Sequence, residues 1–202
     1  MNRADAPPKF TKAAQKLLAL LEGRPIVLVG MMGAGKTSVG RRLATQLGRG
    51  FIDSDHEIEA AAGMSIPDFF SRHGEAAFRA GEAKVVERLL KDDNIVLATG
   101  GGAFVDPKTR AIIEKNAVSV WIKADFDLLF ARVSRRANRP LLQTPNPEQT
   151  LKDLIEERYP TYALADVTII SKDVPQDIVA AEIIKVLLAF MVSPKSQAPD
   201  TK

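Results

Sequence analysis

The amino-acid sequence predicts an open, three-layer α/β fold in which a parallel sheet of about five strands carries helices on both faces. Short runs that are apolar at almost every position alternate along the 202 residues with longer stretches whose apolar residues recur at helical spacing. Strands that are apolar on both faces are typical of parallel sheets covered on both sides. Ligands of such sheets bind beyond the carboxyl ends of the strands, which makes the motifs at those ends informative.

In the first part of the chain, a helix is expected within Pro7–Gly23, where leucines recur at helical spacing. The apolar run Ile26–Val29 is the first core strand, and a second helix follows over Gly35–Leu47. A second strand is expected at Gly50–Asp55. Strand and helix therefore alternate from the start.

The middle of the chain continues this alternation. Helical stretches are expected at Ser65–His73 and Glu75–Lys91, ahead of the apolar strand Ile95–Ala98. A helix near Pro107–Lys115 and a strand at Val118–Ile122 follow.

In the last part of the chain, a helix begins at about Phe126, and a proline-broken segment occupies Pro140–Pro147. Leu151–Arg158 is expected to be helical, and Asp166–Ile170 is expected to be the last strand. Ile178–Phe190, apolar at helical spacing, closes the fold as a helix.

Composition excludes several classes of protein. A content of 46% hydrophobic and 26% charged residues is typical of soluble globular domains, and no apolar run is long enough to span a membrane. The absence of cysteine excludes disulfides, thiolate nucleophiles and cysteine-based zinc sites. No secretory signal is visible at the start of the chain, so a cytoplasmic location is expected. A net charge of only +3 does not demand a nucleic-acid partner.

A phosphate-binding loop is the strongest functional motif. Gly30–Thr37 reads Gly-Met-Met-Gly-Ala-Gly-Lys-Thr and matches G-x-x-x-x-G-K-[ST] between an expected strand and an expected helix. In this motif backbone N–H groups surround the phosphates, the lysine, here Lys36, bridges the β- and γ-phosphates, and the hydroxyl of Thr37 ligates Mg²⁺. The sequence therefore predicts ATP binding with Mg²⁺. The predicted nucleotide contacts of this loop are Gly33, Ala34, Gly35, Lys36, Thr37 and Ser38.

Two carboxylates stand at the end of the second expected strand. Asp53 and Asp55 are two residues apart there, so the period of two places both on one face. One could then order the hydration shell of Mg²⁺ while the other accepts a proton from an attacking hydroxyl. The alternatives are a solvated strand end or a helix cap for the segment that starts at His56.

Two further motifs suit binding of an acceptor. Arg79 and Glu82 are three residues apart in an expected helix, so Glu82 could hold the guanidinium in place, or the two could form an ordinary surface ion pair. Gly100, Gly101 and Gly102 end the third strand, which indicates either close approach of a ligand to the backbone or a flexible turn. The histidines His56 and His73 are too few for a metal site.

Together these motifs resemble shikimate kinase. The resemblance is carried by six blocks in the family's order, which extend from about Ile26 to Phe190: Gly30–Thr37, Phe51–Asp55, Phe78-Arg79 with Glu82, Gly100–Gly102, Arg139-Pro-Leu-Leu142, and Arg158-x-Pro-x-Tyr162-x-x-Ala-Asp166. It implies a fold like that of the nucleoside monophosphate kinases. It also implies transfer of the γ-phosphoryl group of ATP to the 3-hydroxyl of shikimate, a step in aromatic amino acid biosynthesis.

The resemblance also implies a role for each matching residue. Asp55 would bind the acceptor hydroxyls and act as base, with Lys36 and Arg139 as the other catalytic residues. Arg79 and Arg158 would bind the shikimate carboxylate, a group suited to bidentate guanidinium contacts. Gly101 and Gly102 would present backbone N–H groups to the acceptor. Thr37 would ligate Mg²⁺, and Asp53 would order the ion through water.

On the nucleotide side, the resemblance implies that an arginine stacks on adenine. Arg132 is the expected one, although Arg135 or Arg136 could take its place, with the segment at Pro175 on the other side of the base. Arg139 would contact the transferring phosphoryl group from a mobile lid at about 132–147. Because Arg139 precedes a proline, its backbone is biased toward an extended conformation.

The expected organisation is one P-loop kinase domain at 25–192, preceded by an extension at 1–24 with a short amphipathic helix and followed by a flexible tail at 193–202. A monomer with no nucleic-acid or membrane partner is expected. The alternatives are a gluconate-type or other small-molecule kinase, whose acceptor pocket would differ, and an ATP-binding module without turnover. The retention of Asp55 and Arg139 argues against the module.

Overall fold

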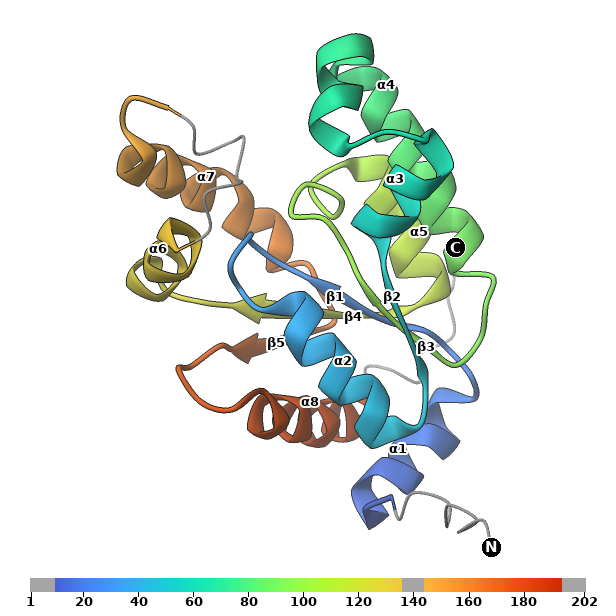
Figure 1. Cartoon of the computed structure of the whole chain (residues 1–202). Coiled ribbons are helices and arrows are strands. Elements are labelled where there is room, and N and C mark those ends of the chain that lie inside the picture. The colour runs from blue at the N-terminus through green and yellow to red at the C-terminus, as the bar shows by residue number, and fades with distance from the viewer. Residues whose placement is uncertain (1–9, 136–143, 194–202) are drawn as a thin grey trace, which may run out of the picture.

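The computed structural model describes residues 10–135 and 144–193. Within these residues a five-stranded parallel sheet lies at the centre, with the strand order β2-β3-β1-β4-β5 (Figure 1). The strands are β1 (Ile26–Val29), β2 (Gly50–Asp53), β3 (Ile95–Ala98), β4 (Val118–Lys123) and β5 (Val167–Ile170). Every residue of β1 and β3 is buried, as expected for central strands covered on both faces.

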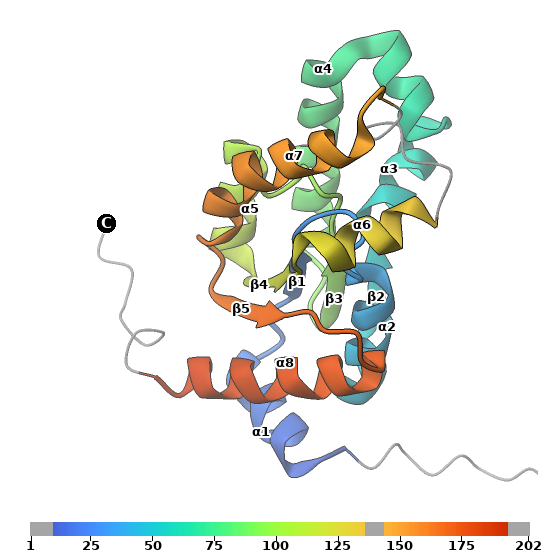
Figure 2. The ribbon, with the colours of Figure 1, turned by 90° about the vertical axis from the view of Figure 1, so that its left-hand side faces the viewer.

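Helices cover both faces of the sheet, so the predicted three-layer α/β fold is confirmed. α8 and α1 lie on one side and α5 and α7 on the other (Figure 2). The helices are α1 (Lys12–Leu21), α2 (Lys36–Leu47), α3 (Ser54–Ala62), α4 (Ile66–Leu89), α5 (Pro107–Asn116), α6 (Phe126–Ser134), α7 (Pro147–Tyr162) and α8 (Gln176–Met191). In the described part of the chain no helix combines the length and apolarity that a membrane crossing needs.

The sheet register brings the functional motifs to one edge. β1 lies between β3 and β4, with Leu28 paired to Ala98 and Val29 paired to Trp121. Asp53, the last residue of β2, pairs with Ala98, the last residue of β3. Because the strands are parallel, the loops that leave their carboxyl ends meet at the same edge.

The N-terminal helix α1 is part of the common hydrophobic core. Thr11 caps it, its hydroxyl accepting a hydrogen bond from the N–H of Ala14 at 3.1 Å. Ala14, Leu17 and Leu21 are buried, and α1 packs against α8. The helix is shorter than the expected range of Pro7–Gly23, whose first three residues lie outside the described part of the chain.

Two other helices correct or refine the sequence expectations. The two expected helices on either side of Gly74 form one element, α4, which is interrupted at Gly74 by a φ of 78° that favours glycine. α7 begins at Pro147, and the expected start at Leu151 is wrong. The Asn146 side chain accepts a hydrogen bond from the N–H of Gln149 at 3.1 Å, and a proline suits the first position of a helix.

Candidate active site

The loop between β1 and α2 has the geometry of an anion-binding turn. Gly35 stands at the N-cap of α2 with a φ of 98°, and Gly33 has a φ of 81° with Val133 packed so closely that a Cβ atom would come within 2.8 Å. Both positions therefore require glycine. The first N–H groups of α2 and the helix dipole favour a negative charge at this end of the helix.

Lys36 is the first residue of α2 and is buried beneath the loop. Its Nζ donates to the carbonyl oxygens of Gly30 at 2.7 Å and Met31 at 3.0 Å. These bonds hold the ammonium group inside the curve of the loop, close to the position that phosphate oxygens would occupy. Thr37 and Ser38, the next two residues, are exposed.

The second expected strand is shorter than predicted, and Asp55 does not lie on it. β2 ends at Asp53, whose Oδ1 caps α3 by accepting the N–H of Asp55 at 3.1 Å. The expectation of two carboxylates on one strand face is therefore wrong, because the N-cap bond starts a helix at Ser54. Both carboxylates nevertheless line the same cavity.

Asp53 also contacts the phosphate loop. The hydroxyl of Thr37 donates to Asp53 Oδ2 at 2.8 Å. A hydroxyl and a carboxylate oxygen this close suit a hard cation such as Mg²⁺, which takes few protein ligands and keeps several waters. Within the described residues no cluster of three or more acidic or histidine side chains could hold a metal, so water and phosphate oxygens would complete its shell.

Asp55 is a carboxylate with a raised pKa. Burial raises the pKa of Asp55, and the charge of Asp53 adds to this, while Lys36 acts in the opposite direction. Asp55 Oδ1 lies within 2.7 Å of the position that a Cβ atom on Gly100 would occupy. The carboxylate therefore occupies space that a side chain at position 100 would need.

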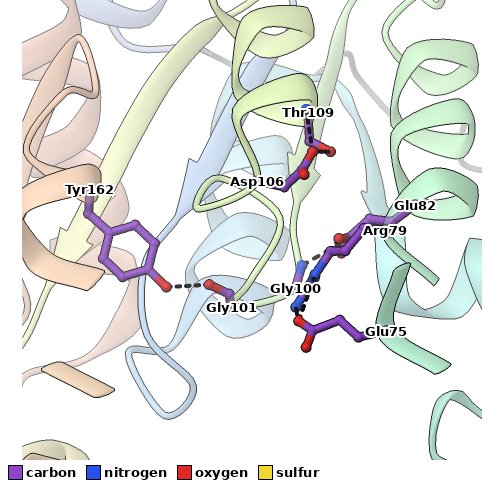
Figure 3. A network of polar contacts seen from close by, with 9 residues as sticks. Glu75, Arg79, Glu82, Gly100, Gly101, Asp106, Thr109 and Tyr162 are labelled. Atoms are coloured by element: carbon purple, nitrogen blue, oxygen red, sulfur yellow. Dashed lines mark hydrogen bonds and ion pairs between the residues drawn. The ribbon is translucent and has the colours of Figure 1, made fainter. Parts of the chain in front are cut away.

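Arg79 and Glu82 form a partly buried ion pair on α4. Arg79 Nη1 contacts Glu82 Oε2 at 2.6 Å, and the Glu82 side chain is only 1% exposed. Arg79 Nη2 also contacts the exposed Glu75 at 3.2 Å, so the guanidinium lies between two carboxylates (Figure 3). Burial alone would lower the pKa of Arg79, but these carboxylates raise it, which keeps the cation charged.

The loop of Gly100–Gly102 is held by hydrogen bonds on several sides. The Gly100 N–H donates to Ser54 Oγ at 3.2 Å, and the Gly100 carbonyl accepts from Ala103 at 3.2 Å. The Gly102 carbonyl accepts from the N–H groups of Val105 and Asp106. The turn is therefore a defined structure that follows β3 into α5.

Arg158, on α7, lies on the other side of this loop. It is 9% exposed, and its Nη1 is 3.8 Å from the position of a Cβ atom on Gly101. Its Nε has no hydrogen-bond partner among the described residues. Arg79 contacts Gly102 and Arg158 faces Gly101, so two cations flank consecutive glycines.

Arg132, on α6, lies at the nucleotide end and touches the phosphate loop. Its Nη1 donates to the Gly33 carbonyl at 3.4 Å and to Ser171 Oγ at 3.2 Å. Ser171 in turn donates to the carbonyl of Ala34 at 3.3 Å. Arg132 therefore joins α6, the phosphate loop and the segment after β5.

A cavity of about 650 Å³ joins most of these groups. Its lining is Met32, Gly33, Gly35, Lys36, Thr37, Ser38, Asp53, Asp55, His56, Thr99, Gly100, Gly101, Arg132, Arg135 and Gln176. Of the predicted site residues, Ala34, Arg79, Gly102, Arg158 and Pro175 are not in this lining. Arg136 and Arg139, and with them half of the expected lid, lie outside the described residues.

Four lining residues had no role in the sequence expectations, namely Met32, His56, Thr99 and Gln176. Gln176 is the first residue of α8, and its Oε1 is 3.6 Å from the position of a Cβ atom on Gly35, at the start of the phosphate loop helix. His56 is exposed and also lines the cavity. The only sequence signal for Gln176 was its place directly after Pro175, at a predicted nucleotide contact.

Comparison with known proteins gives one consistent result. The family model described as shikimate kinase matches residues 32–188. The shikimate kinase of Bradyrhizobium diazoefficiens is 54% identical over 199 residues, which cover 98% of this chain and 96% of that protein. The shikimate kinase of Rhizobium leguminosarum bv. trifolii is 54% identical over 170 residues, 84% of this chain and 87% of that protein.

Solved structures agree. Shikimate kinase from Acinetobacter baumannii in complex with shikimate superposes with a TM-score of 0.82 at 41% identity, covering 88% of this chain and 99% of that one. The enzyme from Aquifex aeolicus gives a TM-score of 0.71 at 34% identity, covering 81% and 95%. These similarities support the interpretation as shikimate kinase over a gluconate-type kinase or a module without turnover.

Proposed function

The chain belongs to the shikimate kinase family, and on this premise we propose that it transfers the γ-phosphoryl group of ATP to the 3-hydroxyl of shikimate. The products are shikimate 3-phosphate and ADP. One observation carries the proposal: Asp55 shares a cavity with Lys36 and the phosphate loop, while Arg79 and Arg158 flank the adjoining glycines. The site therefore combines a phosphate-binding loop, a catalytic base and two arginines that can bind the carboxylate of the acceptor.

The phosphate loop binds the triphosphate through the N–H groups at the start of α2. Lys36 neutralises charge on the β- and γ-phosphates, and its buried position keeps it aligned with them. In phosphoryl transfer the protein mainly positions the reactants and stabilises charge, so a prearranged ammonium group contributes directly to the rate.

We include Mg²⁺ in the proposal. Thr37 would hold the ion through its hydroxyl, and Asp53 would order its water ligands, which fits the 2.8 Å contact between the two side chains. When bound, the cation neutralises charge on the phosphate oxygens. The other carboxylate oxygen of Asp53 accepts the N–H of Asp55 at the start of α3, and this bond fixes the carboxylate in place.

The acceptor binds at the glycine loop. Arg79 and Arg158 hold the shikimate carboxylate, since a guanidinium group bonds a carboxylate through two parallel N–H groups. The N–H groups of Gly101 and Gly102 contact the acceptor, and Asp55 binds its hydroxyls. Asp55 takes the proton of the 3-hydroxyl as the oxygen attacks phosphorus, and its raised pKa makes it a stronger base than an ordinary aspartate.

The remaining roles concern the nucleotide and the lid. Arg132 and Pro175 are proposed to contact adenine from two sides, and Arg139 to contact the transferring phosphoryl group. Arg132 already joins the phosphate loop to the segment after β5. This position suits an adenine ring bound between Arg132 and Pro175. We also propose that the working form is a monomer and that its location is cytoplasmic.

The position of the new phosphate tests this function. Shikimate incubated with MgATP and the protein should yield one phosphorylated product, whose ³¹P–¹H coupling in an NMR spectrum places the phosphate on the 3-oxygen. A product phosphorylated at another hydroxyl would contradict the proposed orientation of shikimate between the arginines and Asp55.

A further inference from the structure

Tyr162 is a fully buried tyrosine whose hydroxyl has a specific partner. It is the last residue of α7, it is 0% exposed, and its hydroxyl donates to the carbonyl oxygen of Gly101 (Figure 3). The ring packs against Trp121, with 5.9 Å between ring centroids, and the hydroxyl lies 3.9 Å from Met31 Sδ. Packing on all sides therefore fixes the position of this hydroxyl.

The bond to Gly101 determines how the next peptide is oriented. No cis peptide occurs in the described part of the chain, and in a trans peptide the C=O and the following N–H point in opposite directions. Because the Gly101 carbonyl points toward Tyr162, the Gly102 N–H points away from it, toward the side on which Arg79 lies (Figure 3). That is the side on which the acceptor carboxylate is proposed to bind.

Tyr162 also has a fixed relation to the second carboxylate-binding residue. It follows Arg158 by four residues on α7, so the two side chains lie on the same helix face. Arg158 Nη1 is near Gly101, whose carbonyl accepts the Tyr162 hydrogen bond. One turn of α7 thus provides Arg158, which would bind the acceptor, and the hydroxyl of Tyr162, which bonds to the glycine loop.

We infer that Tyr162 is a positioning residue of the acceptor site, which holds the peptide between Gly101 and Gly102 so that the Gly102 N–H faces the acceptor. The inference rests on the proposed function for the identity of that acceptor. Burial raises the pKa of Tyr162 to about 12, although Arg158 acts in the opposite direction, so the hydroxyl keeps its proton at physiological pH. The glycines have no side chains that could fix the conformation of this loop. The hydrogen bond from Tyr162 restricts the loop instead.

Tyr162→Phe removes only the hydroxyl, and Tyr159→Phe is its matched control. Tyr159 lies on the same helix, in the same aromatic cluster, and its hydroxyl also donates to a backbone carbonyl, that of Ala124. Ala124 precedes α6 and is not part of the glycine loop. Each variant therefore loses one tyrosine-to-carbonyl bond, but only one of them releases Gly101.

Amide hydrogen exchange of residues 99–106 tests the inference without any substrate. Tyr162→Phe should raise exchange in this segment about 2- to 10-fold, because one hydrogen bond of the loop is lost, and Tyr159→Phe should leave it unchanged. Equal exchange in wild type and Tyr162→Phe, or an equal rise in both variants, would overturn the inference.

Steady-state kinetics give the second readout. Tyr162→Phe should raise the KM for shikimate about 2- to 10-fold, with the KM for ATP unchanged. A loss shared equally by both substrates would indicate a merely structural role and overturn the inference. A wild-type protein without shikimate turnover would contradict the proposed function, while the exchange measurement would still decide the role of Tyr162.

Discussion

Arg79 lies directly against Gly102, so closely that a Cβ atom on Gly102 would come within 2.3 Å of Arg79 Nη2. Glu82 contacts the same guanidinium at 2.6 Å. The position of this arginine is thus set by the carboxylate of Glu82 and by the absence of a side chain at Gly102. The carboxylate-binding role proposed for Arg79 depends on both.

Gly102→Ala should displace Arg79 and reduce kcat/KM for shikimate by about 10- to 100-fold, because small misplacements of binding groups have large effects on rate. Gly102 has no positive φ, so the effect would be steric rather than a backbone strain. ATP affinity, measured by titration calorimetry, should stay unchanged. Gly81→Ala is the control, since nothing lies within 4 Å of its Cβ position. Wild-type kinetics for Gly102→Ala would contradict the packing argument.

Glu82→Gln should lower kcat/KM for shikimate by about 10-fold or more, equivalent to about 1.4 kcal/mol. The substitution keeps the shape of the side chain but leaves the Arg79 cation without its buried counter-charge. Glu75→Gln removes the exposed partner of the same arginine and should change the value by less than about 2-fold. The account fails if the two variants lose activity equally in an initial-rate assay.

Asp55→Asn should remove turnover while ATP affinity stays within about 2-fold of wild type, because an amide cannot take the proton of the acceptor hydroxyl. A coupled assay for ADP measures the rate, and a titration with ATP measures the affinity. Turnover near the wild-type rate would exclude Asp55 as the base.

The same substitution should stabilise the fold at neutral pH. Burial and then Asp53 raise the pKa of Asp55, so the folded protein binds this proton more tightly than the unfolded chain does. Stability is therefore lost as the pH rises from the unfolded pKa through the folded pKa. The neutral amide of the Asp55→Asn variant avoids this loss, and calorimetry at pH 7 should show a higher Tm, by roughly 2–4 °C per kcal/mol relieved. The difference should shrink as the pH falls through the pKa of Asp55; a lower Tm at pH 7 would contradict the argument.

Leu17→Ala should lower the free energy of unfolding by about 2–5 kcal/mol and Tm by roughly 5–15 °C, because Leu17 is fully buried between α1 and the rest of the core. The value of kcat at 25 °C should change little, since α1 leads into the amino end of β1, whereas the cavity is lined by loops that follow the carboxyl ends of the strands. Lys16→Ala, at an exposed neighbouring position, is the control for thermal unfolding. Equal Tm values for the two variants would show that α1 contributes nothing to stability.

The fold could be predicted because its signals are local. Runs such as Ile26–Val29 and Ile95–Ala98 are apolar at every position, and this pattern directly reflects burial on both faces of a parallel sheet. The break at Gly74 was also visible, because glycine separates two helical stretches. The start of α7 at Pro147 differs from the expected start at Leu151, because Asn146 caps the helix ahead of its apolar residues.

The site was predictable only in part, because its geometry depends on contacts between distant segments. The capping bond of Asp53 moved Asp55 from a strand to a helix, yet the cavity still brings both carboxylates together. The contacts of Tyr162 with Gly101 and of Gln176 near Gly35 join α7 and α8 to loops far away in sequence. No periodicity or motif encodes such contacts.

The most direct test of the central claim is ADP release by the purified protein with MgATP, compared among shikimate, gluconate, nucleoside monophosphates and no acceptor. The account predicts ADP release that depends on shikimate and exceeds the rate with every other acceptor. Faster release with gluconate or a nucleoside monophosphate, or no release above the acceptor-free rate with shikimate, would contradict the roles proposed for Asp55, Arg79 and Arg158.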